Sequence, residues 1–123
     1  MIEILFATLV IYVIHLVLPT MISVVRGEAD ITYLFGPRDE ARTDSAVVER
    51  ARRSSRNLQE SLLIFLPLAV LAGNNGAAAE AATIWLGVRI AYTVTYLLGL
   101  AYVRTLVWFV SLAYLYMMAA ALV

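Results

Sequence analysis

The sequence predicts an all-α integral membrane protein, a bundle of four helices that each cross a bilayer. Apolar residues make up 63% of the chain and its mean hydropathy is +0.85, whereas about half of a soluble domain is apolar. These residues are gathered into long runs, and a spanning helix needs about 20 of them. The predicted helices lie at about 3–25, 46–72, 77–98 and 103–122. The chain is short enough to form a single domain over residues 1–123.

Two residues interrupt the first run, His15 and Pro19. An ionisable residue inside a spanning helix can be functional, but a hydrogen bond from His15 to a neighbouring helix is the simpler role, and both remain open. Pro19 is tolerated in a bundle because a neighbouring group can satisfy the backbone carbonyl that proline leaves free. Neither residue therefore argues against a spanning helix.

The segment between the first two runs is the main polar part of the chain. Gly36–Asp39 is predicted to form a turn. Tyr33–Phe35 forms an apolar patch that lies either on the bilayer surface or against the bundle. Asp44 or Ser45 is the expected N-cap of the second helix.

The remaining connections are short. Pro67 is a possible kink site in the second helix, and Gly73–Gly76 is a tight turn. The link at 98–102 joins the last two runs directly, so these should form an antiparallel hairpin. We see no repeat and no pattern typical of strands.

The charges exclude several classes of function. Formal net charge is zero, all nine basic residues are arginine, and acidic residues are interleaved with them, so no nucleic-acid partner is expected. The chain has no cysteine and one histidine, so no metal site is expected. The segment 26–56 is rich in arginine and should be cytoplasmic, with both termini and the turn at 74–76 outside. The predicted location is a multi-pass inner (cell) membrane, with membrane lipids around it.

Polar residues enter three of the apolar runs from the arginine-rich side. In the second helix they recur at i, i+3, i+4 and i+7, which places them on one stripe. The third helix carries a similar set, and the fourth begins with another, followed one turn later by Trp108. The candidate site residues are Arg53, Arg56, Asn57, Glu60, Arg89, Tyr92, Tyr96, Arg104 and Thr105.

Glu60 is the carboxylate within this set, and arginines are expected to converge on it. The converging residues would be Arg53, Arg56, Arg89 and Arg104, with Arg26 as a further candidate. A net positive site suits a small ligand with more than one carboxylate, whose ammonium group Glu60 could receive. Alternatively, Glu60 pairs with Arg56 or Arg89 and only locks helices together. The residues alone leave these two roles open.

Three motifs resemble one known family. The run RSSRNLQE, from Arg53 to Glu60, resembles the R-x-x-R-N-x-x-E signature of the membrane-associated proteins in eicosanoid and glutathione metabolism, the MAPEG family. The segment Arg89–Tyr96, followed by Arg104, resembles the family's pattern in its third and fourth helices. Gly36–Glu40 resembles a loop of its bacterial members.

The resemblance implies a homotrimer of four-helix subunits, with glutathione bound between neighbouring subunits at the cytoplasmic side. The matching glutathione-contacting positions are Arg53, Asn57, Glu60, Tyr92, Tyr96 and Arg104. Arg104 would stabilise the thiolate, since a nearby cation lowers a thiol pKa, and Thr105 is the second catalytic candidate. Ser61, Thr105 and Trp108 depart from the residues of the eicosanoid synthases, so eicosanoid specificity should not be transferred.

The expected function is therefore an inner-membrane glutathione-binding protein. It would transfer glutathione to, isomerise or reduce a lipophilic electrophile, as a glutathione transferase or peroxidase does. One alternative is a non-catalytic membrane module that binds a lipid headgroup or another anion on the same scaffold. A small multidrug transporter is disfavoured, because Glu60 lies near the end of a span and not at its centre.

Overall fold

A computed structural model describes residues 1–37 and 44–123 of the chain. The predicted turn at Gly36–Asp39 and the bacterial-type loop at Gly36–Glu40 therefore lie partly outside the described residues. Within the described residues the secondary structure is entirely helical. The helices are α1 (Ile2–Val25), α2 (Ile31–Phe35), α3 (Ala46–Ala72), α4 (Gly76–Leu97) and α5 (Ala101–Ala120).

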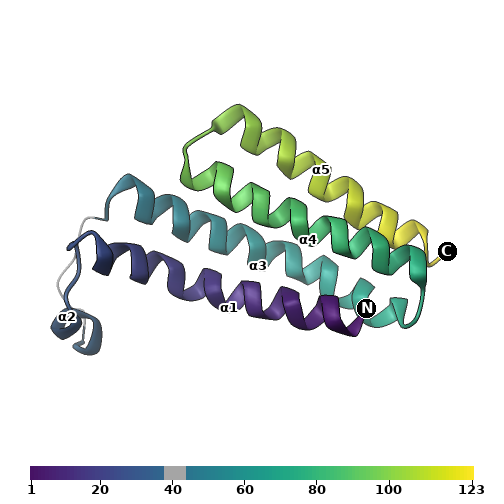
Figure 1. The fold of residues 1–123 in the computed structure, drawn as a ribbon, viewed down its shortest axis with the longest axis horizontal. Coiled ribbons are helices and arrows are strands. Elements are labelled where there is room, and N and C mark those ends of the chain that lie inside the picture. Colours follow the sequence, from purple (N-terminus) through teal and green to yellow (C-terminus); the bar gives the residue numbers. More distant parts are fainter. Residues whose placement is uncertain (38–43) are drawn as a thin grey trace.

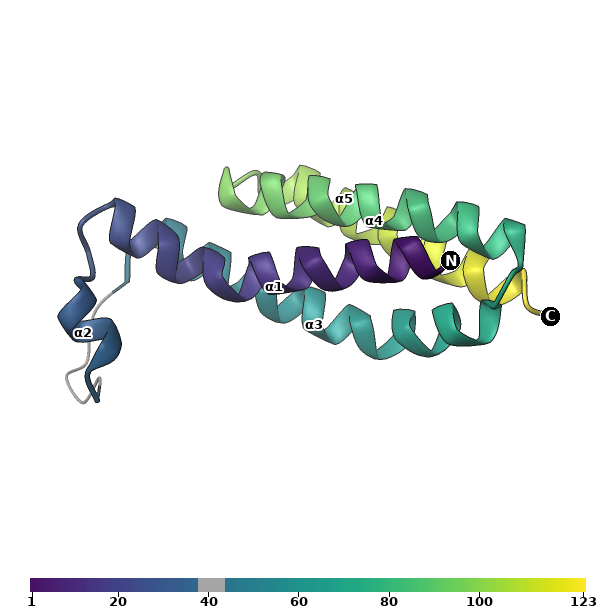
Figure 2. The same ribbon diagram turned by 60° about the horizontal axis from the view of Figure 1, so that its bottom comes forward.

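The four long helices run alternately up and down (Figure 1). The closest packing is between α4 and α5, then between α1 and α3, and α3 joins the two pairs through α4. The N-terminus, the α3–α4 turn and the C-terminus lie at one end, and α2 lies at the other, beyond the end of α1 (Figures 1 and 2). The long helices begin and end within two residues of the predicted ranges.

The short helix α2 was not predicted as a helix. Its N-cap is Asp30, whose side chain accepts a 2.7 Å hydrogen bond from the backbone nitrogen of Tyr33. Tyr33 and Leu34 line a hollow with Pro19 and Ser23 of α1, while Phe35 is 88% exposed. The apolar patch of the sequence is thus divided, with two residues facing the bundle and the third facing outward.

The core lies between α3, α4 and α5. The rings of Phe65 and Trp85 stack at 4.2 Å, and Leu58, Leu115 and Met118 pack around them. Burying such large side chains contributes about 1.5–3 kcal/mol each in water, but within lipid the same contacts act mainly through close packing. This cluster fixes how α4 and α5 lie against α3.

Asn75 ties the α3–α4 turn to the end of α5. Its Oδ1 accepts a 3.0 Å hydrogen bond from the backbone nitrogen of Ala78, which caps α4. Its Nδ2 donates to the backbone oxygen of Ala121 at 2.9 Å, just past the end of α5. One side chain therefore satisfies backbone groups at two helix termini.

At the opposite end of the bundle, an arginine of α3 lies against the α4–α5 turn. Gly99, in the α4–α5 turn, has φ +74°, a left-handed conformation that favours glycine. A Cβ atom there would lie 3.0 Å from the guanidinium of Arg50. The first turns of α3 thus contact the turn from which α5 begins.

Helices α3 and α4 satisfy polar groups in the middle of α1. Pro19 has no backbone N–H to bond the carbonyl of His15, and the Ser55 hydroxyl donates to this carbonyl instead, at 2.7 Å. His15 Nε2 lies 2.7 Å from Thr93 Oγ1, which confirms the predicted hydrogen bond to a neighbouring helix. His15 Nδ1 lies 2.7 Å from the Ile11 carbonyl oxygen, which only accepts, so Nδ1 carries a hydrogen.

Two of the described helices, α1 and α5, are long and apolar enough to cross a membrane by length and composition. Their outward faces expose large apolar side chains such as Phe6 and Phe109, as a lipid-facing surface requires. The sequence predicted four spans. Neither α3 nor α4 meets the same criterion. The first half of α3 is rich in arginine, and α4 contains the charged residues Glu80 and Arg89, which lower the mean hydropathy of each helix.

Candidate functional site

A hollow of about 210 Å³ opens between α3, α4 and α5. It lies toward the end of the bundle where α4 turns into α5, because its α5 residues belong to the first two turns of that helix. Tyr92 and Tyr96 lie one helical turn apart on α4, and Arg104 and Trp108 lie one turn apart on α5, so each helix presents one face to the pocket. We call it the α3–α5 pocket, and its lining residues are Asn57, Tyr92, Tyr96, Arg104, Thr105 and Trp108.

Arg104 gives the α3–α5 pocket a positive charge. Its Cζ lies 4.6 Å from the centre of the Tyr96 ring, a cation–π distance. The rings of Tyr96 and Tyr92 pack edge to face, with their centroids 5.6 Å apart. No acidic residue pairs with Arg104 among the described residues. The guanidinium is therefore held in place by an aromatic face and remains able to bind an anion.

The hydroxyl of Thr105 is already engaged within α5. It donates a 3.0 Å hydrogen bond to the backbone oxygen of Ala101, one turn earlier. In this geometry Thr105 offers lone pairs and no proton to the pocket. A catalytic role for Thr105 as a hydrogen-bond donor would require its side chain to rotate.

Arg89 lies behind the pocket in a buried position. It is 2% exposed, its Nη2 donates to Asn57 Oδ1 at 2.7 Å, and its Cζ lies 4.5 Å from the centre of the Tyr92 ring. The Nε and Nη1 atoms have no hydrogen-bond partner among the described residues. Arg89 is thus a buried cation whose polar partner is an amide and not a carboxylate.

Next to Arg89 lies a cluster of hydroxyl groups that sequence reasoning missed. The Ser54 hydroxyl donates to Thr93 Oγ1 at 3.1 Å, and Thr93 lies within 3.2 Å of the Arg89 backbone oxygen and 2.7 Å of His15 Nε2. The spacing in the sequence could have indicated Thr93, because it follows Arg89 by one helical turn and lies on the same face of α4. The cluster connects α1, α3 and α4 behind the pocket.

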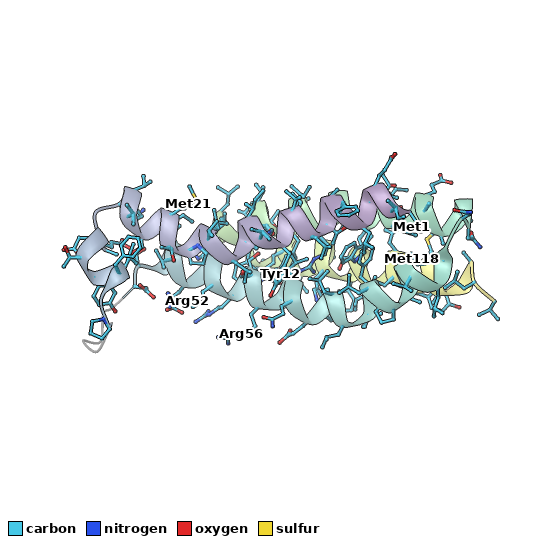
Figure 3. The ribbon with its side chains drawn as sticks, turned by 90° about the horizontal axis from the view of Figure 1, so that it is seen from below. Met1, Tyr12, Met21, Arg52, Arg56 and Met118 are labelled. Atoms are coloured by element: carbon cyan, nitrogen blue, oxygen red, sulfur yellow. The ribbon has the colours of Figure 1, made fainter. Side chains whose placement is uncertain are left out.

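Only part of the predicted stripe on α3 faces the α3–α5 pocket. Asn57 faces α4 and the pocket, whereas Arg53, Arg56 and Glu60 are exposed, and Figure 3 shows Arg56 pointing away from the bundle. The convergence of arginines on Glu60 is therefore not found within one chain. The arginines do not converge because the stripe covers roughly 100° of the helix surface. It therefore extends from the face of α3 that packs against α4 to the exposed face.

The alternative role for Glu60, an ion pair with Arg56 or Arg89, is also not found. Within residues 1–37 and 44–123 Glu60 forms no ion pair, and Arg89 bonds to Asn57 instead. Arg26, the remaining arginine expected near Glu60, pairs with Glu28 at 3.0 Å. The described residues also contain no cluster of three potential metal ligands.

These features define a helical membrane protein with a cationic, aromatic-walled pocket between three of its helices. The chain belongs to the MAPEG family, because the model of that family matches residues 4–123. Comparisons with curated proteins and with solved structures gave no match.

Proposed function

We propose that the protein binds glutathione, or a similar acidic thiol, in the α3–α5 pocket and adds it to a lipophilic electrophile. The observation that carries this proposal is the Arg104 guanidinium, which stands over Tyr96 at the pocket wall. Over residues 1–37 and 44–123 it has no acidic partner. A thiol peptide with two carboxylates offers anionic groups to such a site, and membership of the MAPEG family supports the choice of glutathione.

The chemistry would depend on the thiolate, which is the nucleophilic form of a thiol. A sulfur placed beside Arg104 would lose its proton to water more readily, because the cation stabilises the negative charge. The sulfur would then form a bond to an electrophilic carbon, and the electrons displaced there would take up a proton or leave with a leaving group. The same thiolate could begin an isomerisation or a peroxide reduction.

The electrophile would enter from the bilayer. Trp108 lines the pocket, and Leu106 and Phe109 on the same helix are exposed on the lipid-facing side of α5. A lipophilic molecule dissolved in the membrane could therefore reach the sulfur without crossing water. We propose that α3 and α4 also span the bilayer, with their polar residues turned inward or toward other subunits.

A trimer would complete the site. Arg53, Arg56 and Glu60 occupy the exposed face of α3, outside the pocket of their own chain. Charged groups near lipid are costly unless they face protein or water. We propose that three copies pack around these faces and bring the residues to the pocket of a neighbour. Native mass spectrometry in mild detergent should show three chains, and a monomer at micromolar concentration would contradict this assembly.

The orientation follows the arginine-rich segment. The described part of 26–56 lies at the same end of the bundle as α2, opposite both termini (Figure 1). Positively charged connections usually remain in the cytoplasm. We propose that the α3–α5 pocket opens to the cytoplasmic side of an inner membrane, where glutathione is available.

The deciding experiment is a titration of detergent-purified protein with glutathione, following the ultraviolet absorbance of the thiolate. We expect saturable binding and a thiolate signal below pH 8.5, the ordinary pKa of a thiol. S-methylglutathione is the matched control, since it should bind without this signal. Absence of binding at millimolar glutathione would contradict the proposal.

A non-catalytic anion-binding module is the second candidate. It is favoured by Arg53 and Arg56, which are exposed and form no ion pair with the residues that the structure describes. Vesicles with and without phosphatidylglycerol distinguish the two functions. A module of this kind would be stabilised by the anionic lipid and would show no thiolate with glutathione. A glutathione enzyme would show the thiolate signal in both kinds of vesicle.

A further inference from the structure

The hydrogen bond between Arg89 and Asn57 fixes which way the Asn57 amide points. Arginine has only donors, so the atom that receives Nη2 at 2.7 Å must be the carbonyl oxygen of the amide. The amide nitrogen then lies on the other side of the same group. Asn57 lines the α3–α5 pocket, whereas Arg89 does not. The two N–H donors of Asn57 are therefore available to the pocket.

Arg89 is placed to act through other side chains and not on a ligand directly. Its guanidinium is almost completely buried, and its neighbours are the Asn57 amide and the Tyr92 ring, both of which also line the pocket. A buried cation polarises the groups that contact it, because the interior screens its charge poorly. The carbonyl oxygen of Asn57 is the polar side-chain atom that accepts a hydrogen bond from the Arg89 guanidinium.

We propose that Arg89 is a positioning residue of the α3–α5 pocket. By holding the Asn57 carbonyl oxygen, it directs the amide nitrogen to donate a hydrogen bond to an oxygen of the bound ligand. This inference rests on the proposed function, in which the ligand is an acidic thiol peptide, and it assigns a carboxylate or peptide oxygen of that ligand to Asn57. A ligand ammonium group is excluded from this position, because it would meet donors.

The variant Asn57→Asp tests the proposal with little change of shape. It replaces the donating nitrogen by an oxygen and gives Arg89 a carboxylate to pair with. We expect the unliganded protein to melt at the same temperature as wild type or higher, and the Kd for glutathione to rise at least about tenfold. If Asn57 only ties α3 to α4, the affinity should stay within about twofold of wild type. That result would overturn the proposal.

Two variants of Arg89 test the donor of the hydrogen bond to Asn57. Arg89→Lys keeps a donor for the Asn57 carbonyl, and we expect its Kd for glutathione to stay within about threefold of wild type. Arg89→Met keeps the length of the side chain without a donor, so Asn57 is free to turn and the Kd should rise by about tenfold. Equal affinity of the Met variant and wild type would overturn the proposal.

A second measurement separates positioning from catalysis. The thiolate signal per bound glutathione should be unchanged in both Arg89 variants, because Arg104 is intact. A loss of this signal at full occupancy would assign Arg89 to the sulfur and overturn the role proposed here. If Arg89→Met does not fold, Asn57→Asp and Arg89→Lys still decide the question. Wild-type protein that binds no glutathione overturns the proposed function as well, whereas normal binding by every variant overturns this inference alone.

Discussion

The Ser55 hydroxyl donates a 2.7 Å hydrogen bond to the backbone carbonyl of His15, the carbonyl that Pro19 leaves without its helical partner. Within the α1–α3 pair, a side chain of α3 thus satisfies a backbone group that is left free in α1. The same stretch of α1 carries the His15 side chain, which reaches Thr93 of α4 at 2.7 Å. The proline and the histidine therefore lie where α1 is joined to both α3 and α4.

Ser55→Ala should destabilise the protein by about 0.6 kcal/mol and by no more than about 1.7 kcal/mol, the average and the maximum measured for hydrogen bonds between membrane helices. Thermal unfolding in detergent measures this loss. In a Pro19→Ala background the helix regains the backbone N–H that bonds His15, so the same serine change should cost much less. Equal losses in both backgrounds would show that the Ser55 hydroxyl does not serve the freed carbonyl.

Asn75→Ala should cost about 0.5–2 kcal/mol, because it removes the cap of α4 and also the bond to Ala121. Asn75→Asp keeps the capping oxygen but replaces the donor to Ala121, and should fall between Ala and wild type. The melting temperature of the detergent-purified protein is the measurement. The neighbouring Asn74 is exposed, so Asn74→Ala is the control and should have little effect.

Arg104→Ala should keep the fold and abolish thiolate formation, while Arg104→Lys should keep part of it. The reason is electrostatic: lysine supplies a point charge beside the sulfur without the planar fork of arginine. A thiolate titration against pH measures the effect, and removal of the cation should raise the apparent pKa of the bound thiol. Arg52→Ala is the control, because Arg52 pairs with Asp44 and Glu49 outside the pocket. An unchanged apparent pKa in Arg104→Ala would contradict the role assigned to Arg104.

Glu60→Gln should leave the unliganded protein within about 0.5 kcal/mol of wild type, as is usual for exposed residues without a special contact. If Glu60 binds the ligand's ammonium group, the same change should weaken glutathione about ten- to a hundredfold. Isothermal titration and thermal unfolding measure the two effects separately. A large loss of stability with normal glutathione binding would assign Glu60 to scaffolding between subunits.

The long helices could be predicted because their signal is local. Runs of apolar residues bounded by glycine or by polar turns set the ends of α1, α3, α4 and α5, and each end agrees within two residues. The helix α2 could not be predicted in the same way. Five residues carry too few turns for a periodic pattern, and α2 is held by the Asp30 cap and by contacts with α1.

The candidate site was predicted as a set of residues but not as a set of contacts. Spacing placed Tyr92 and Tyr96 on one face of α4, and they do share a pocket with Arg104. Spacing could not say which neighbour each polar residue of α3 meets, since that depends on how α3 rotates against α4. In the structure Asn57 accepts a hydrogen bond from Arg89, whereas Glu60 is exposed and does not line the pocket.

The buried cation of α4 also bears on how the chain enters the membrane. An arginine at the centre of a helix opposes insertion by about 2.5–3.5 kcal/mol, and α4 is not apolar enough to pass as a span by itself. Its closest packing partner is α5, which is long and apolar enough to cross a membrane. If α4 spans the bilayer, as proposed above, we expect α4 and α5 to leave the translocon as one hairpin, in which the apolar α5 favours the entry of α4 into the lipid. Synthesis of the last helix would then be the step that commits Arg89 to the bilayer.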